Sequence, residues 1–579
     1  MSESKKKLSR RDFIQKSLAG SAALSPLSMF LSNVFADYLS KATAHAQGVE
    51  AENLMSMFNF YMTGGPARWM WDLPLSNQET EDLGNPMLIT KYGGGPSGSP
   101  GIYKSTLVNG IYLPLFWSGN LPTSNGGTIA AAELAHHMFM IRGVEHASDG
   151  HGLNANRMLA PVPGPNLPGL VADASTRSVP SIGISGTNGY FNSAKGLSHL
   201  SAAPGLTLLS SAMTPFQQTS TKGLLINDLS LGLPLGVNSP TEAVFDTFFS
   251  AMAQNSGNLQ RFMPSTFQDR QNAKDLMKRN YSALADSYDS LKAKYQSLAS
   301  RALASTEAEL KIVGVDDVAI PGDKDNPHFT MTVRNDSSDT LEADAKPIYS
   351  GSDLRGICTS QTDIVNLVDS FVLAEYMLVN KLSQSVSGFL TGRINKLSLD
   401  SVHVNTTSGQ VRYQNLLGDF WIDQHDDGAA IPLMINTRYF KAISACLFEL
   451  ISVLKAQSLF NDTMINMVSE FTRMPYSGGL GTGHGYKGAP FSFINGRVNG
   501  TISIGNIGYE KQGELTLTER GLWGAAAPTI GTRTINAGNV ASTVAAIVGV
   551  KSPSPNNMAL AKIEGDNVIP LVTSRINKT

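Results

Sequence analysis

The sequence pairs carboxylates with imidazoles in a way that could bind a divalent metal. Asp423 and His425 are two residues apart in Trp-Ile-Asp-Gln-His, after the apolar segment 397–404. Residues two apart in an extended segment face the same side, so both side chains can reach one ion. Carboxylate with imidazole suits zinc, manganese or iron, and the residue types alone do not distinguish these metals from calcium. We therefore expect a divalent metal cofactor.

A second group of polar residues lies at and after the end of the apolar segment 463–471. Glu470 and Arg473 lie in Ser-Glu-Phe-Thr-Arg, and His484 lies on the glycine-rich loop Gly-Thr-Gly-His-Gly. Each also has an ordinary explanation, because Glu470 and Arg473 could form a local ion pair and His484 could be a surface residue. Their joint position after a predicted strand favours a site.

A third group follows the apolar segment 138–144. It ends at His151 in His-Ala-Ser-Asp-Gly-His, which offers further potential metal ligands. Ligands of open α/β sheets bind beyond the carboxyl ends of the strands. Because all three groups come after predicted strands, we expect them to line a single cleft.

The elements that must position these residues alternate between strand and helix. The short apolar segments 54–62, 138–144, 397–404 and 463–471 predict buried strands, and apolar side chains at helical spacing predict helices over 364–382 and 440–454. A buried parallel strand is apolar on both faces, and short apolar segments are typical of such strands. The pattern predicts an α/β fold with a largely parallel sheet flanked by helices.

A long helical region interrupts this alternation. Over residues 277–298, large apolar side chains recur in steps of four and three for three heptads. Such an arm could pack on itself, on the main domain, or on a second copy as a homodimer. We expect residues 52–265 and 351–579 to form the α/β core, with 266–350 inserted as a helical arm and loop.

The first 46 residues have the features of a twin-arginine signal peptide. Arg10 and Arg11 precede a weakly apolar stretch, and Ala44-His45-Ala46 offers a cleavage site, with a second one at Ala36. The other interpretation is a basic, disordered N-terminus. The stretch is too polar to span a membrane. We expect export by the Tat translocase, a periplasmic mature chain and no transmembrane anchor.

Composition and cysteine content restrict the partners and the chemistry. The formal net charge is −2 over 579 residues, which gives no support for a nucleic-acid partner. The two cysteines, Cys358 and Cys446, could form a bridge in an oxidising compartment. Cys446 lies within an apolar helical pattern, so core packing is the favoured interpretation.

Several of these motifs resemble those of a bacterial, Tat-exported family known as domain of unknown function number 1501, in the alkaline phosphatase and sulfatase superfamily. The similarity covers most of the mature chain in the same order, and its most specific block is Ser-Glu-Phe-x-Arg-x-Pro. The matching segments are Gly64-Gly65-Pro66-Ala67, Arg142-Gly143-Val144 with His151, Ile422-Asp423-Gln424-His425, Thr463 to Pro475, and Thr482-Gly483-His484.

The resemblance implies an alkaline-phosphatase-like core and a metal-dependent hydrolase of phosphate or sulfate esters. Asp423, His425 and His484 would bind one metal, and Glu470 would serve a second, with His151 beside it. Arg473 would hold an oxygen of a small anionic ester.

The chain departs from the family at three polar positions. Ala67 stands where the family has serine, Met70 where it has an acidic residue, and Gly483 where it has aspartate. Asp72 is close enough to replace the acid at Met70 after a one-residue shift. Thr63 supplies another hydroxyl at the strand end, which makes it a candidate nucleophile.

These departures support a second hypothesis. The chain could be a non-catalytic envelope or ligand-binding protein on the same fold. Trp69, Trp71 and Trp421 beside the presumed site would suit a carbohydrate-like ligand. The family has no settled activity, so the resemblance does not choose between the two hypotheses.

Overall fold

The structure is a computed structural model of the full chain. It describes residues 54–73, 105–202, 290–303, 347–348 and 363–573, apart from gaps at 147–149, 178, 185, 196, 198, 365, 391–392, 407–408, 423–429, 476–481 and 512–520. Residues 1–46, where a signal peptide is predicted, the first part of the predicted arm and the candidate ligands Asp423 and His425 lie outside the described residues.

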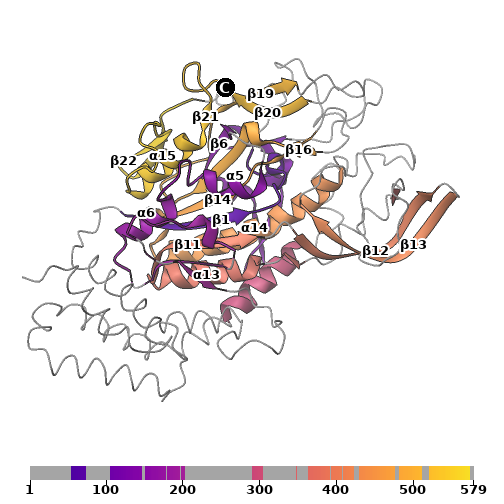
Figure 1. Ribbon diagram of the computed structural model, residues 1–579. Coiled ribbons are helices and arrows are strands. Elements are labelled where there is room, and N and C mark those ends of the chain that lie inside the picture. The colour runs from indigo at the N-terminus through magenta and orange to yellow at the C-terminus, as the bar shows by residue number, and fades with distance from the viewer. Residues whose placement is uncertain are drawn as a thin grey trace, which may run out of the picture.

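A nine-stranded sheet forms the centre of the molecule (Figure 1). Its path runs β18-β6-β17-β14-β1-β11-β7-β8, with β21 also paired to β6. Every strand except β17 runs in the same direction, because only β17 pairs antiparallel with its neighbours. The strands are β1 (Ser56–Met62), β6 (Met138–Glu145), β7 (Val179–Ile184), β8 (Leu200–Ala202), β11 (Ser383–Leu390), β14 (Thr463–Ser469), β17 (Ala489–Ile494), β18 (Ile502–Ile504) and β21 (Ile535–Asn536).

Strand β1 is buried on both faces, as its sequence predicts. Phe58 and Phe60 point into one apolar core, and Met57 and Tyr61 point into the other. The first core also contains side chains of α13 (Leu367–Val379), α14 (Ala430–Ala456) and the helical residues 290–303, while the second contains those of α6 (Leu167–Ala174) and α15 (Ala537–Val548). The predicted α/β fold with a largely parallel, helix-flanked sheet is therefore confirmed.

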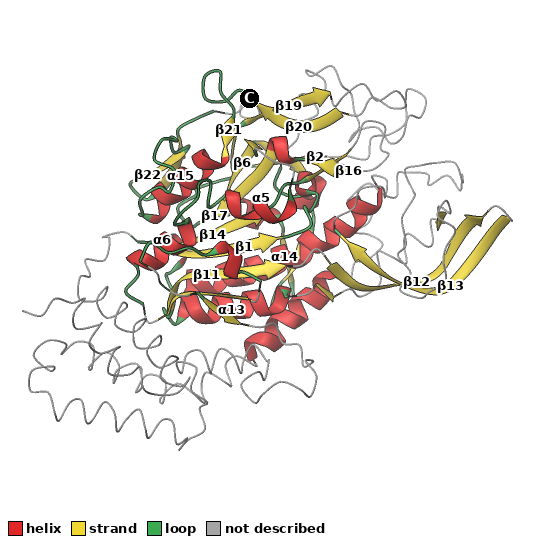
Figure 2. Cartoon of the chain, viewed as in Figure 1, coloured by secondary structure: helices red, strands yellow, loops and turns green. Residues whose placement is uncertain are grey.

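The segment 397–404 is a strand, but the prediction that it belongs to the central sheet is wrong. It lies in β12 (Arg393–Thr406), which pairs antiparallel with β13 (Gly409–Trp421). Together with β9 (Pro347–Ile348) and β10 (Asp363–Ile364) they form a separate four-stranded sheet, and the long hairpin extends away from the body (Figure 2). Asp423 and His425 thus follow an antiparallel hairpin.

The last part of the predicted arm packs on the main domain of the same chain. Residues 290–303 are helical, and Tyr295 and Leu298 are buried in the first core. The Arg301 guanidinium donates hydrogen bonds to the carbonyl oxygens of Thr123, Gly126 and Gly127, at 2.7–3.0 Å. Of the heptad positions within 290–303, Leu291 also packs against the chain's own core, and the homodimer through 277–298 remains a prediction.

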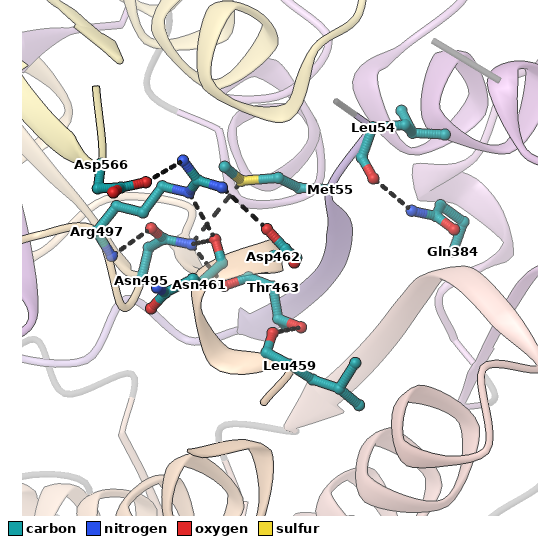
Figure 3. Close-up of polar contacts among 10 residues, drawn as sticks. All are labelled: Leu54, Met55, Gln384, Leu459, Asn461, Asp462, Thr463, Asn495, Arg497 and Asp566. Atoms are coloured by element: carbon teal, nitrogen blue, oxygen red, sulfur yellow. Dashed lines mark hydrogen bonds and ion pairs between the residues drawn. The ribbon is translucent and has the colours of Figure 1, made fainter. Parts of the chain in front are cut away.

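Polar contacts fix the edge of the sheet at which its parallel strands begin (Figure 3). The Asn495 amide donates to the carbonyl oxygen of Thr463, at the start of β14, at 2.8 Å. The Arg497 guanidinium lies 3.1 Å from Asp462, and Gln384 donates to the carbonyl oxygen of Leu54 at 3.1 Å. These contacts hold the amino-terminal ends of β1, β11 and β14 in place.

Two predictions about the described residues can be compared with the structure. None of the described helices is long and apolar enough to cross a membrane. Cys446 is a free thiol buried in α14, which confirms its predicted packing role. The remaining elements are η1 (Arg68–Met70), β2 (Ser105–Val108), β3 (Ile111–Pro114), η2 (Leu115–Ser118), β4 (Asn120–Pro122), β5 (Thr128–Ala130), α4 (Ala132–Ala135), α5 (His151–Arg157), η3 (Asn188–Tyr190), η6 (Phe460–Asp462), β15 (Arg473–Pro475), β16 (Thr482–His484), η7 (Tyr486–Gly488), β19 (Asn506–Lys511), β20 (Gly521–Ala527), β22 (Ala561–Glu564) and β23 (Asn567–Pro570).

Candidate functional site

Three of the predicted site residues converge beyond the carboxyl end of β14. His151 Nδ1 is hydrogen-bonded to the carboxylate of Glu470, although the two residues are 319 apart in the chain. The rings of His151 and His484 meet edge to face, with centroids 4.7 Å apart. We call these three residues the imidazole–carboxylate cluster. The expectation that these strand-end groups share one place is met for them.

Glu470 is oriented by the turn that follows the neighbouring strand β1. The Gly64 amide donates to Glu470 Oε1 at 3.3 Å. Gly64 and Gly65 have φ values of 88° and 60°, a conformation that glycine adopts without strain. A Cβ atom at Gly65 would overlap the Phe471 ring. Gly64 and Gly65 therefore allow the loops after β1 and β14 to approach each other closely.

His484 is brought to the cluster by the hairpin of β15 and β16. Arg473 and His484 are register partners in this hairpin, and the Gly485 amide donates to the Thr472 carbonyl at 2.8 Å. The His484 ring stacks on Phe471 with centroids 4.1 Å apart and planes at 25°. The Phe471 ring thus packs against one face of the His484 imidazole.

The hydrogen bond to Glu470 sets the chemistry of His151. An ionised carboxylate only accepts hydrogen bonds, so Nδ1 carries the proton and Nε2 carries the lone pair in the neutral ring. The His151 side chain is 37% exposed, while that of Glu470 is 5% exposed. A buried carboxylate behind an accessible imidazole is the arrangement found in general acid–base pairs and behind metal-bound histidines.

Tyr190 is a further polar residue near the cluster that the sequence does not predict. Its ring stacks on Tyr61, with centroids 4.3 Å apart. Burial, and then the negative charge of Glu470, raises the pKa of Tyr190 to about 12. Its hydroxyl therefore stays protonated at neutral pH and can only be a donor or a neutral acceptor there.

Arg473 and Thr63 lie at the same edge, but both are held by the fold. Arg473 is 1% exposed and its guanidinium lies 5.3 Å from the Phe471 ring centre. The Thr63 hydroxyl donates to the Leu390 carbonyl oxygen at 2.9 Å. Their expected roles, in binding a substrate oxygen and as a nucleophile, remain predictions.

Trp69 and Trp71, two of the three tryptophans expected beside the site, are structural. Trp71 is buried in the first core, where it stacks on Phe440 at 5.2 Å, and Trp69 donates from its indole nitrogen to the Arg473 carbonyl at 2.6 Å. Asp72, which could have replaced the missing acid, binds the Arg68 guanidinium with both oxygens. These side chains hold the loop after β1 and do not line an open cleft.

His146 is an uncharged buried histidine at the end of β6. It is 2% exposed, and neither ring nitrogen has a hydrogen-bond partner among the described residues. Burial, followed by the positive charge of Arg157, lowers the pKa of His146 from 6.5 to about 4. It is thus a neutral ring at physiological pH.

The described residues do not by themselves form a metal centre. No group of three His, Cys, Asp or Glu side chains within this part of the chain could hold a metal ion. The donor set here is two imidazoles, with the Glu470 carboxylate engaged by His151 and Gly64. A complete set would need residues outside it, such as the expected ligands Asp423 and His425.

The chain matches no protein-family model, no curated protein and no solved structure.

Proposed function

We propose that the chain is a hydrolase of small phosphate or sulfate esters in which His151, oriented by Glu470, is the acid–base group. The single observation that carries this proposal is the hydrogen bond between His151 Nδ1 and the buried Glu470 carboxylate. A carboxylate that fixes the tautomer and stabilises the imidazolium is how histidine bases are prepared in hydrolases.

The proposed reaction uses water as the nucleophile. His151 Nε2 removes a proton from water as the water oxygen bonds to phosphorus or sulfur, and Glu470 stabilises the imidazolium. The ester bond from phosphorus or sulfur to the alcohol oxygen breaks, and the imidazolium returns its proton to the leaving alkoxide. His484 and the protonated Tyr190 would donate hydrogen bonds to the oxygens that gain charge.

Water is preferred over Thr63 as the nucleophile. The Thr63 proton is directed to a backbone carbonyl at 2.9 Å, and activation requires a base within hydrogen-bond reach of that proton. A divalent metal, if bound with the help of Asp423 and His425, would neutralise the ester oxygens and lower the pKa of water. Because the described donors are incomplete, no step of the reaction is assigned to it.

A non-catalytic ligand-binding protein is the second candidate. Ala67 favours it, since this methyl group occupies the position where the resembling family has a hydroxyl, and its amide is bound by the Asn436 side chain at 3.1 Å. The same polar cluster would then bind a small anion or carbohydrate-like ligand without turning it over.

Both candidates are proposed to act after export. The twin-arginine pattern at residues 1–46 supports periplasmic localisation, and cell fractionation of wild type and of a variant with Arg10 and Arg11 replaced by lysine tests it. Retention of the variant in the cytoplasm is the expected result.

Turnover and metal content separate the two candidates. The mature chain is assayed with aryl phosphate and aryl sulfate, and its Zn, Mn, Fe and Ca are measured. We expect His151→Gln and Glu470→Gln to lower kcat by about 10²–10⁴. His136→Gln, on a half-buried histidine ahead of β6, is the matched control and should keep full activity. Absence of turnover with every metal supplied would instead favour the binding protein.

A further inference from the structure

We propose that Arg68 and Asp72, together with the hydroxyls of Ser469 and Thr472, position Glu470 and so fix the tautomer of His151. This inference rests on the proposed function, because it assigns a role to residues behind the same cluster. We call these four residues the positioning set. They act on Glu470 through the backbone on either side of it, and we do not assign them contact with a substrate.

The first anchor lies immediately before Glu470. Arg68 is fully buried and holds Asp72 through two hydrogen bonds, the first at 2.5 Å between Nε and Oδ1. With the remaining side of its guanidinium, it donates to Ser469 Oγ at 2.8 Å and to the Met467 carbonyl at 3.3 Å. Asp72 thus fixes the Arg68 guanidinium, and the guanidinium in turn fixes the end of β14.

The second anchor lies just after Glu470. The Arg68 amide donates to Thr472 Oγ1 at 2.8 Å. Next to it, the Trp69 indole donates to the Arg473 carbonyl at 2.6 Å. One short helical turn, η1, therefore holds the chain at residues 469, 472 and 473.

Only Glu470 and Phe471 lie between the two anchors. Phe471 lies against Gly65, where a Cβ atom would overlap its ring, and Glu470 accepts from the Gly64 amide at 3.3 Å. The backbone is thus held on both sides of Glu470, and the carboxylate contacts the Gly64 amide and His151 Nδ1. The positioning set is thus connected to the reactive imidazole through a single residue.

The chemistry of the pair supports a positioning role over a purely stabilising one. A buried ion pair loses the hydration of both charges, and apolar replacements of such pairs are often as stable or more stable. Arginine is suited to this task because its planar fork binds a carboxylate bidentately while keeping donors for other groups. Here those other donors reach Ser469 and Met467, and the carboxylate they help to place is Glu470.

The test removes the anchors and spares the ion pair. Loss of Arg68 would leave Asp72 as an uncompensated buried charge and endanger folding. Ser469→Ala and Thr472→Val each delete one anchor, while Thr472→Ser keeps the hydroxyl. Ser444→Ala is the matched control, because buried Ser444 accepts from the Trp71 indole at 3.0 Å and so also loses one hydrogen bond to the same loop.

The readout is the tautomer of His151, measured by NMR on histidine-labelled mature protein and assigned with His151→Gln. We expect Ser469→Ala and Thr472→Val each to lower the ratio of Nδ1-protonated to Nε2-protonated ring by about fivefold, the factor that corresponds to one ordinary hydrogen bond. Thr472→Ser and Ser444→Ala should keep the wild-type ratio.

An unchanged tautomer ratio in both anchor variants, with the proteins folded, would overturn the proposal. The same holds for a change of equal size in Ser444→Ala, which would mean that any loss of a bond to the loop suffices. This measurement needs no substrate. A chain that hydrolyses no ester therefore disproves the proposed function, while the tautomer ratio still decides whether the set positions Glu470.

Discussion

Acid should destabilise the fold through His146, and replacing it by leucine should remove that part of the acid sensitivity. The His146 ring is buried, neither of its nitrogens has a hydrogen-bond partner among the described residues, and burial lowers its pKa from 6.5 to about 4. Below pH 6.5 the unfolded chain therefore binds a proton at this residue while the folded chain does not. Stability is complete above pH 6.5 and is lost as the pH falls toward 4.

The size of the effect follows from the two pKa values. Between about pH 7.5 and about pH 5, one histidine shifted in this way costs about 2 kcal/mol of unfolding free energy, and the loss reaches about 3 kcal/mol below pH 4. Leucine has a similar shape and no polar atoms to desolvate. His146→Leu should therefore match or exceed the stability of wild type at about pH 7.5.

Urea unfolding of the mature chain at both pH values measures the effect. We expect the loss on acidification to be about 2 kcal/mol smaller in His146→Leu than in wild type. His136→Gln controls for removal of a histidine as such. Equal pH dependence in His146→Leu and wild type would refute the reasoning, because the proton would then be taken up by other groups. The half-buried His199, whose pKa burial also lowers to about 4, would be the next residue to replace.

Three further predictions concern packing inside the protein. Gly65→Ala should lower the free energy of unfolding in urea by about 1–3 kcal/mol, because Gly65 has φ of 60° and a Cβ there would overlap Phe471. A variant as stable as wild type would show that the loop can move aside. With Cys358 replaced by serine, Cys446 should react with a thiol reagent only as fast as the protein unfolds, since burial raises the pKa of its thiol. Fast reaction of the native protein would contradict this. Tyr295→Phe removes a 2.6 Å hydrogen bond to Glu375 and should lower the free energy of unfolding by about 2 kcal/mol. It should also speed proteolysis within 290–303. Unchanged proteolysis would mean that apolar contacts alone hold this helix.

The central strands were predictable where a strand is apolar on both faces. β1 and β14 have this pattern, because each packs against helices on both sides. β11, which pairs with β1, was missed since its sequence Ser-Gln-Ser-Val-Ser-Gly-Phe-Leu is half polar. The segment 397–404 was placed in the wrong sheet, because an apolar segment predicts a strand without indicating which strand it pairs with.

The members of the imidazole–carboxylate cluster were predictable for a different reason. His151, Glu470 and His484 are polar residues after strands or on a glycine-rich loop, and the carboxyl edge of a parallel sheet gathers such residues. Their partners were not predictable in the same way. Arg68 approaches Ser469 from 401 residues away, and no local pattern encodes that contact.

Ala67 offers the decisive comparison between direct attack by water and a lost serine nucleophile. If the chain has only lost its nucleophile, Ala67→Ser should restore it, and a covalent intermediate should appear as a burst of released phenol from an aryl ester. If His151 activates water directly, the new hydroxyl has no role and enters a fully buried position. We expect the second outcome, with no burst and a loss of about 1–3 kcal/mol in stability unless the hydroxyl finds a partner. A burst in Ala67→Ser that disappears in Ala67→Ser/His151→Gln would show that the histidine serves a hydroxyl nucleophile, and the water mechanism would have to be abandoned.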